Sequence, residues 1–339
     1  MNADNIAAPE PGVNMRRRQF IALGAAAAWP FAAKAQQAKK RPLIGWLGGG
    51  TPTTGARSLE AFLRGLREYG YEDGKTIDIV YRWAEGDLVR FPALAKELTA
   101  LSPDVIVSAS SPGNIALMQS TASIPIVGAL TIDPVKLGLA VSHNRPGRNF
   151  TGILVTIDGL PGKQAEVLLQ LLPRADTLGV LMNPDSPPQS ILFREIETAL
   201  HATPVRVVQA VARTAPDLPA AFDKLKRDRV DGVVILADAM FFTEVAQIIS
   251  LAAATQMPAI HGYREHVQRG GLVSYGVDIP QNFRRTGYFV DRILKGIKPG
   301  DLPIELPTKL ELAINLKAAK ALNLEIPSKF LFTADEVIE

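Results

Sequence analysis

The 339-residue chain contains no cysteine. This absence excludes a disulfide framework, a thiolate zinc site, a cysteine nucleophile and lipid attachment through an N-terminal cysteine. A strong excess of one charge is absent too, because the formal net charge is +3 and the first 35 residues carry +2 of it. A body this close to neutral gives no reason to expect a nucleic-acid partner. Hydrophobic residues make up 47% and charged residues 21%, which is typical of a folded chain of about two domains.

Catalytic motifs are also absent from the sequence. Gly48 to Gly50 follow a predicted strand, but Pro52 and Thr53 depart from the pattern of a dinucleotide-binding loop. No phosphate loop ending in Gly-Lys-Ser/Thr and no Gly-x-Ser-x-Gly elbow occurs. His261 ends a predicted strand and can face a cleft, but its five-residue spacing from His266 matches no zinc-binding helix. We therefore expect a protein that is not an enzyme and that holds no metal and no cofactor.

The N-terminus has the layout of an export signal. Three arginines at 16–18 precede an apolar run over 20–33, and the small-x-small end Ala-Lys-Ala follows. That run is shorter than the roughly 20 residues that cross a bilayer as a helix. The stretch RRQFI resembles a twin-arginine signal, although a third arginine replaces the usual polar residue before the pair. We expect residues 1–35 to be a signal peptide that is cleaved near Ala35-Gln36 and delivers the protein to the periplasm, by the twin-arginine or the general route.

Short apolar runs alternate with helical periodicity along the rest of the chain. Strands are predicted at 42–47, 76–81, 105–107, 126–127, 178–182, 205–208, 233–236, 258–260, 272–275 and 309–314. Helices are predicted between them, because apolar residues recur there at spacings of three and four. Such alternation is typical of parallel sheets that helices cover on both faces. A polar, turn-forming loop at 144–149 separates two similar α/β units.

We predict an α/β fold of two Rossmann-like or flavodoxin-like lobes, each with a parallel sheet. The elements after Gly271 are too few for a third domain, so they are expected to complete the two sheets. Lobe 1 is predicted to comprise residues 42–150 and about 278–307. Lobe 2 is predicted to comprise residues 151–277 and about 308–330. Crossovers of this kind form a hinge, with a ligand cleft at the strand ends.

Polar side chains gather where predicted strands end. Ser108, Ser110 and Ser111 follow the third strand, where their hydroxyls and a helix N-terminus suit an anionic group. Asp133 and Asp238 each follow a strand as well. Either carboxylate can cap the helix that follows it or hold the ammonium group of a ligand. The residues by themselves leave both roles open.

Several stretches of the chain carry a family resemblance. They include RPLIGWLGGGTP, DPVKLGLAVSHNRPGRNFTG and GGLVSYGVDIPQNFRRTGYFVDRILKG. With them the chain resembles the bacterial ABC transporter substrate-binding proteins of the tryptophan-binding type, which have a type I periplasmic binding protein fold. The resemblance implies two hinged lobes that close on a small solute and deliver it to a membrane permease driven by a cytoplasmic ATPase. We expect a monomer, and the alternatives are a ligand-sensing module for a membrane receptor or an exported α/β enzyme.

The resemblance also implies ligand contacts in strand-end loops of both lobes. The implied residues are Gly50, Thr51, Ser110, Ser111, Thr131 and Asp133 in lobe 1, and Asn183, Asp238 and Tyr263 in lobe 2. Hydroxyls and helix N-termini suit the carboxylate of an amino acid, and an aspartate suits its ammonium. Members of the family differ in solute, so tryptophan itself does not follow. Trp46 lies inside a predicted strand, where we expect it to pack in the core.

Overall fold

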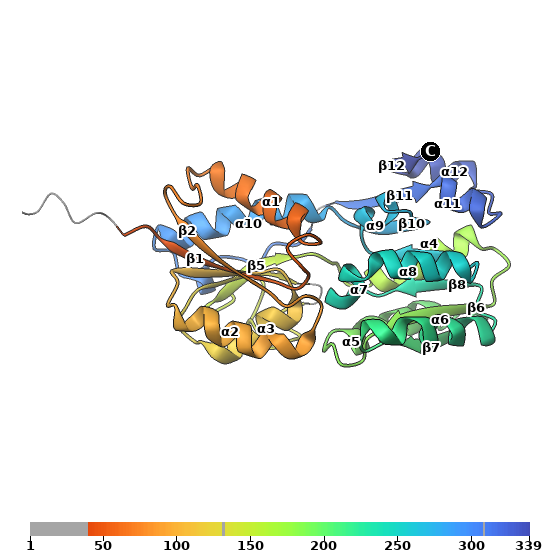
Figure 1. Ribbon diagram of the computed structural model, residues 1–339, viewed down its shortest axis with the longest axis horizontal. Coiled ribbons are helices and arrows are strands. Elements are labelled where there is room, and N and C mark those ends of the chain that lie inside the picture. Colours follow the sequence, from red (N-terminus) through yellow and green to blue (C-terminus); the bar gives the residue numbers. More distant parts are fainter. Residues whose placement is uncertain (1–39, 131–132, 308) are drawn as a thin grey trace, which may run out of the picture. The chain divides into compact units, whose positions relative to one another are not determined.

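The computed structural model describes residues 40–130, 133–307 and 309–339. The expected signal peptide and Thr131 lie outside the described residues. Two separate β-sheets organise the compact unit of residues 42–339 (Figure 1). We call the first sheet with the helices packed on it lobe 1, and the second sheet with its helices lobe 2.

The sheet of lobe 1 has five parallel strands in the order β2-β1-β3-β4-β5. Its strands are β1 (Leu43–Gly48), β2 (Asp78–Trp83), β3 (Val105–Ser108), β4 (Ile126–Leu130) and β5 (Phe150–Leu154). Its helices are α1 (Ala56–Arg67), α2 (Phe91–Ala100), α3 (Ser111–Ser120) and α10 (Ile279–Leu294), with short turns of 3-10 helix at Leu88–Arg90 and Pro299–Asp301. Helices α1 and α10 cover one face and α2 and α3 the other (Figure 1). Because both faces are covered, the inner strands β1 and β3 are almost entirely apolar, with Ser108 at the end of β3 as the polar exception.

The sheet of lobe 2 has seven strands in the order β12-β11-β10-β9-β8-β6-β7. Its strands are β6 (Thr177–Met182), β7 (Arg206–Val211), β8 (Gly232–Ile235), β9 (Ala259–His261), β10 (Val273–Val277), β11 (Leu310–Asn315) and β12 (Glu336–Ile338). Its helices are α4 (Leu160–Leu171), α5 (Gln189–Leu200), α6 (Leu218–Arg227), α7 (Ala239–Thr243), α8 (Val245–Ala254), α9 (Arg264–Gln268), α11 (Leu316–Ala321) and α12 (Ser328–Thr333), with a 3-10 turn at Ala215–Asp217. All its described pairings are parallel except that of β10 with β11.

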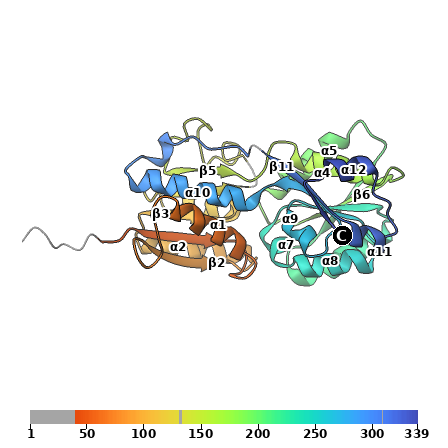
Figure 2. The same ribbon diagram turned by 90° about the horizontal axis from the view of Figure 1, so that it is seen from above.

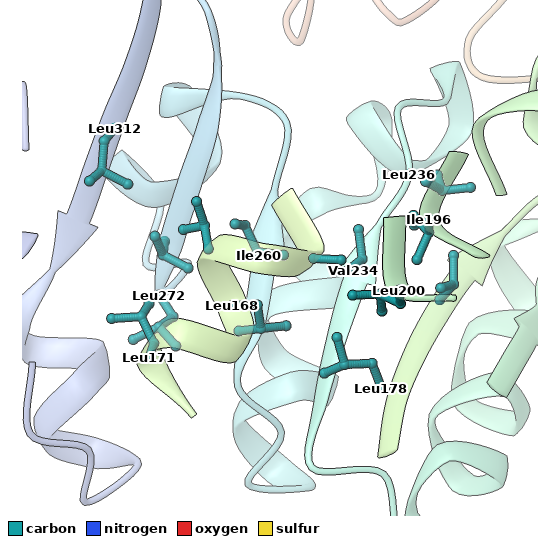
Figure 3. Packing of buried hydrophobic residues seen from close by; sticks show 14 of the residues in the cluster. Leu168, Leu171, Leu178, Ile196, Leu200, Val234, Leu236, Ile260, Leu272 and Leu312 are labelled. Atoms are coloured by element: carbon teal, nitrogen blue, oxygen red, sulfur yellow. The ribbon is translucent and has the colours of Figure 1, made fainter. Parts of the chain in front are cut away.

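The core of lobe 2 forms where α4 lies on the sheet. Leu168 and Leu171 of α4 are buried against strand residues that include Leu178, Val234 and Ile260 (Figure 3). Burial of each such side chain contributes about 1.5–3 kcal/mol, so this packing stabilises α4 on the sheet of lobe 2. The periodic spacing of leucines along α4 is what places them on one face.

The chain passes between the two sheets after β5, after β10 and before β11 (Figure 2). After β10 it runs directly into α10, which packs against α1 of lobe 1. Gly65 and Gly287 make this helix crossing possible. A Cβ on Gly65 would lie only 2.0 Å from the carbonyl oxygen of Arg284, so the two backbones touch there.

The α/β class and the two mainly parallel sheets are confirmed, and two expected limits need correction. The expected boundary between 150 and 151 falls inside β5, which pairs with β4 over Phe150–Leu154. Thr151 and Gly152 interrupt the apolar run there, which is why the stretch does not look like a strand in the sequence. The second sheet also continues past residue 330 to β12, a short, half-exposed edge strand that carries little apolar signal.

Candidate functional site

A cavity of about 100 Å³ lies at the carboxyl ends of strands from both sheets. The loop after β1 lines it from lobe 1, and the loops after β8 and β9 line it from lobe 2. The two sides approach closely, since a Cβ on Gly49 would lie 3.2 Å from Cβ of Ala239. A volume of this size holds several water-sized groups. Strand ends of open α/β sheets are the usual place for a ligand.

Two indole rings form the apolar wall on the side of lobe 1. Trp46 is fully buried and stacks on Phe62, with ring centroids 5.2 Å apart. A Cβ on Gly48 or Gly55 would lie 2.2 or 2.4 Å from the Trp83 ring, so glycine alone leaves room for that indole. The Nε1 of Trp46 is buried and has no hydrogen-bond partner among the described residues. Trp46 therefore packs in the core, as expected, and also lines the cavity.

The loop after β3 brings hydroxyls and a helix N-terminus to the cavity. The Oγ of Ser110 accepts a hydrogen bond from the backbone N–H of Gly113 (3.2 Å) and so caps α3. The side-chain amide of Asn114 donates to the carbonyls of Ser110 (2.8 Å) and Ala129 (3.3 Å), which ties the loop to β4. Ser110 and Ser111 both line the cavity. The partial positive charge of the α3 N-terminus makes this side suited to an anionic group.

On the opposite side, Asp238 uses its two carboxylate oxygens differently. Oδ1 accepts hydrogen bonds from the backbone N–H groups of Met240 (2.8 Å) and Phe241 (3.4 Å), and so caps α7. Oδ2 is buried and has no hydrogen-bond partner of good geometry among the described residues. The side chain lines the cavity. An unpartnered carboxylate oxygen is a strong acceptor for a cationic donor.

The electrostatics of Asp238 follow from its surroundings. Burial raises the pKa of its carboxyl, and the hydrogen bonds from the α7 backbone act in the opposite direction. Ser186 and Asn183 lie close enough to lower the pKa as well, but neither makes a well-formed bond to Oδ2. Asn183 is fully buried and does not line the cavity. Its Oδ1 accepts a hydrogen bond from the backbone N–H of Asp185 (3.1 Å).

An aromatic group completes the wall on the side of lobe 2. The rings of Phe242 and Tyr263 meet edge to face, with centroids 5.5 Å apart. Tyr263 also packs against His266 at 5.2 Å, and burial raises the pKa of its hydroxyl. His261, which was expected to be able to face the cleft, does not line this cavity. Rings at this distance hold one another in place and leave a flat apolar surface.

The structure gathers some of the expected residues and separates others. Gly50, Ser110, Ser111, Asp238 and Tyr263 line the cavity.

Thr51 and Asp133 lie outside it. Thr51 is within hydrogen-bonding distance of Thr54, at 3.1 Å between the hydroxyls. Oδ1 of Asp133 accepts from the backbone N–H of Val135 (2.8 Å) and lies 3.0 Å from Nε2 of His143. Asp133 therefore holds its own turn together.

Several residues that line the cavity are not predicted from the sequence. They are Trp83, Ser186, Phe242, Ile279 and Phe283, among others. Apolar and aromatic residues in a strand or helix carry the same pattern whether they face a core or a cavity. Only the strand-end position of Ser186, shortly after β6, was a usable signal.

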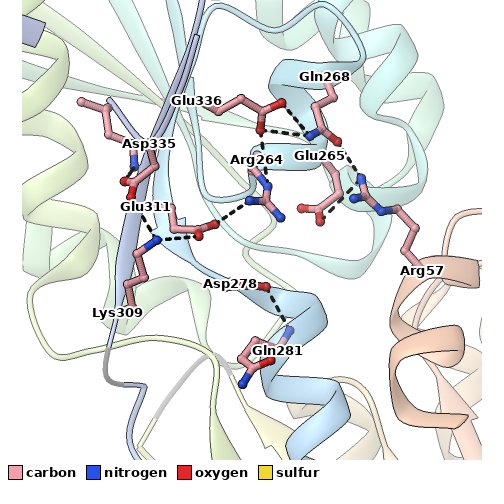
Figure 4. Close-up of polar contacts among 11 residues, drawn as sticks. Arg57, Arg264, Glu265, Gln268, Asp278, Gln281, Lys309, Glu311, Asp335 and Glu336 are labelled. Atoms are coloured by element: carbon pink, nitrogen blue, oxygen red, sulfur yellow. Dashed lines mark hydrogen bonds and ion pairs between the residues drawn. The ribbon is translucent and has the colours of Figure 1, made fainter. Parts of the chain in front are cut away.

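A chain of polar contacts joins the lobes outside the cavity. Arg57 of α1 donates to Oε1 of Gln268 on α9 (2.6 Å) and lies 3.9 Å from Oε1 of Glu265 (Figure 4). Gln268 in turn donates to both carboxylate oxygens of Glu336 on β12 (3.0 Å each), and Arg264 lies 3.6 Å from the same carboxylate. The contact from lobe 1 therefore ends in a network that is anchored in the edge of the second sheet.

The comparison of the sequence with known families decides the class of this protein. Residues 56–338 match the family described as ABC transporter substrate binding protein. The chain belongs to this family. It is the substrate-binding protein of an ABC transporter, with the type I periplasmic binding protein fold. The family and its structural neighbours bind solutes and are not enzymes.

Known relatives support the same assignment. The chain is 25% identical to the tyrosine-binding protein of Clostridioides difficile (strain R20291) over 271 residues, which is 79% of this chain and 77% of that protein. A conserved domain protein from Vibrio cholerae is 27% identical with a TM-score of 0.83, and the match covers 88% of this chain and 100% of that one. An ABC domain from Streptococcus pneumonia in complex with L-Trp is 24% identical with a TM-score of 0.81 and the same coverage.

Substrate-binding proteins of this family act outside the cytoplasm. Two further observations concern the described part of the chain. Across residues 40–130, 133–307 and 309–339, no helix is both long and apolar enough to cross a membrane. The same residues contain no group of three or more His, Asp or Glu side chains placed to hold a metal ion.

Proposed function

We propose that the protein binds an L-amino acid with an aromatic or other apolar side chain, as the solute-binding component of an ABC importer. The observation that carries the proposal is the unpartnered Oδ2 of Asp238 in a cavity whose other side holds Ser110 and the N-terminus of α3. These groups match the ammonium and the carboxylate of a zwitterion. The indole of Trp46 and the ring of Tyr263 match an apolar side chain between them. The relatives named for tyrosine and crystallised with L-Trp support this class.

A series of trimmed ligands tests the proposal. L-phenylalanine is compared with 3-phenylpropionate, which lacks the ammonium, and with phenethylamine, which lacks the carboxylate, by calorimetric titration. The first compound leaves Asp238 without its partner and the second leaves Ser110 and the N-terminus of α3 without theirs, so we expect the affinity to fall about tenfold or more in each case. A thermal-shift panel of amino acids and sugars runs beside it, since a ligand at one hundred times its dissociation constant stabilises the folded state by about 2.7 kcal/mol. Binding of 3-phenylpropionate as tight as that of the best amino acid would contradict the zwitterion assignment.

We propose further that the lobes are two domains that close on the solute. Lobe 1 would comprise residues 42–154 and about 279–307, and lobe 2 residues 155–278 and about 309–339. The crossings after β5, after β10 and before β11 would act as the hinge, and the ligand would stabilise the closed state because it touches both sides. Small-angle scattering with and without the solute tests this. An unchanged radius of gyration on saturation would contradict closure.

Transport itself needs a cellular test. We propose that a monomer delivers the solute to a membrane permease with its cytoplasmic ATPase, and that residues 1–35 direct export by the twin-arginine route. Deletion of the gene should abolish uptake of the labelled solute, and a variant with Arg17→Lys and Arg18→Lys should leave the protein in the cytoplasm. Normal export of that variant would assign the general secretion route. Normal uptake without the gene would favour a sensory role, and a solute recovered in altered form would favour an enzyme.

A further inference from the structure

Lobe 2 holds a second cavity of about 150 Å³, open to solvent at a rim that includes Ala253 and Ala321, and it shares no lining residue with the first. Helix α8 contributes Ile249 and Ala252 to its wall, and Leu272 comes from the segment before β10. Helix α11 contributes Ala318 and Ala321, and Leu322 follows directly after the helix. Apart from His261, none of its lining residues carries an ionisable side chain. The wall of the cavity is therefore mostly apolar, with two polar side chains, His261 and the exposed Gln256.

His261 supplies that polar group from the end of β9. The side chain is 1% exposed, and its Nδ1 lies 3.3 Å from Nδ1 of His266. Its Nε2 is buried and has no hydrogen-bond partner among the described residues. A Cβ on Gly271, which also lines the cavity, would lie 3.0 Å from this nitrogen. Nε2 therefore lies against a residue that lines the cavity, and an occupant whose hydrogen-bonding group displaced this contact would satisfy it.

The state of the imidazole limits what that occupant can be. Burial lowers the pKa of His261 to about 4, so the ring is neutral near pH 7. Either ring of the histidine pair can donate the Nδ1 contact, which leaves Nε2 of His261 as a donor in one arrangement and an acceptor in the other. A hydroxyl pairs with both arrangements because it donates and accepts. A carboxylate or an ammonium would lie among apolar walls without a counter-charge.

The volume sets the size of the occupant. An enclosed apolar cavity of about 150 Å³ can hold benzene, so a volume of this size admits a molecule of one ring. We propose that this cavity is a second ligand site, for a neutral molecule of one ring that carries a hydroxyl bonded to Nε2 of His261. This site is independent of the solute proposed for the first cavity, because the two have no wall in common.

Phenol and toluene are the matched probes, because they differ in a hydroxyl and a methyl of similar size. Titration of the purified protein should give millimolar binding of phenol and binding of toluene that is about tenfold weaker. Long-range proton–nitrogen NMR should show the Nε2 resonance of His261 move with phenol, while the resonances of His201, which is exposed, stay in place. Equal affinity for the two probes, or no binding of phenol, would overturn the proposal.

Two matched substitutions locate the phenol. Ala318→Leu fills the second cavity from α11, and Ala109→Leu fills the first cavity from the loop after β3; both alanines are half-buried. We expect Ala318→Leu to abolish phenol binding and Ala109→Leu to leave it unchanged, with near-ultraviolet circular dichroism confirming the fold of each. The reverse pattern would place phenol in the first cavity and refute the second site. If Ala318→Leu fails to fold, Ala321→Leu at the exposed rim of the same cavity serves in its place.

Discussion

Replacement of Asp238 by asparagine separates the binding role of this side chain from its structural role. Asparagine caps a helix about as well as aspartate does, so the bonds from Met240 and Phe241 to the side-chain oxygen should persist. What the variant loses is the negative charge on the oxygen that has no partner in the cavity. The fold and the proposed binding function should therefore respond in opposite ways.

The magnitudes follow from burial. Loss of one partner from a buried charge pair costs about 2 kcal/mol or more, so the affinity for an amino acid should fall about 30-fold. The free energy of unfolding without ligand should stay the same or rise by about 1 kcal/mol, because a buried carboxylate becomes a neutral amide. Burial raises the pKa of the Asp238 carboxyl in the folded state. At low pH the group is protonated in both the folded and the unfolded state, so burial costs no stability there. The stability advantage of the variant should therefore appear as the pH rises above the ordinary pKa of 3.8, where the unfolded state releases its proton first.

Calorimetric titration and urea denaturation measure the two quantities on the same preparations. Asp133→Asn is the matched control, because Asp133 also follows a strand but bonds Val135 and His143 away from the cavity. We expect the control to bind the solute like the wild type. Binding of Asp238→Asn as tight as that of the wild type would refute the binding role. A loss of more than about 2 kcal/mol of stability with unchanged affinity would make Asp238 a structural residue alone.

Three further predictions concern stability and closure. Gly65→Ala should destabilise the protein by about 2 kcal/mol in urea denaturation, because the new Cβ would lie 2.0 Å from the carbonyl oxygen of Arg284, and this outweighs a gain of about 1 kcal/mol in helix propensity; a more stable variant would contradict the contact. Burial lowers the pKa of His261 from 6.5 to about 4, so the unfolded state binds the proton first and the free energy of unfolding should fall by about 3 kcal/mol between pH 6.5 and 4; denaturation of His261→Phe should show a flatter pH profile. Arg57→Ala removes an exposed contact with Gln268 that is worth at most about 1 kcal/mol, so the solute affinity should fall less than about fivefold; a larger loss would mean that the contact is needed for closure.

Much of the fold could be predicted from local pattern. An apolar run that ends in glycine or a polar residue predicts a strand from a window of about ten residues. The strands β1, β3, β6 and β8 and the loops after them are predicted in this way. The same reasoning placed Ser110 and Asp238 at loops where ligands of α/β sheets lie. The strands β5 and β12 were not predicted. Gly152 interrupts the apolar run of β5, and β12 is a half-exposed edge strand with little apolar signal.

The choice between the two aspartates was decided by tertiary structure alone. Asp133 and Asp238 have the same local signature, a carboxylate one turn after a buried strand. Which of them faces a cavity depends on how distant parts of the chain pack. Asp133 meets His143, whereas Asp238, at the N-terminus of α7, lines the first cavity. Trp46 likewise packs in the core and lines the cavity. The sequence pattern of an aromatic residue in a strand is the same whether its ring contacts a core or a cavity. The alternation of elements and the strand ends are local properties, so a window of ten residues suffices to predict them. The walls of both cavities come from segments far apart in the chain and exist only once the sheets are packed.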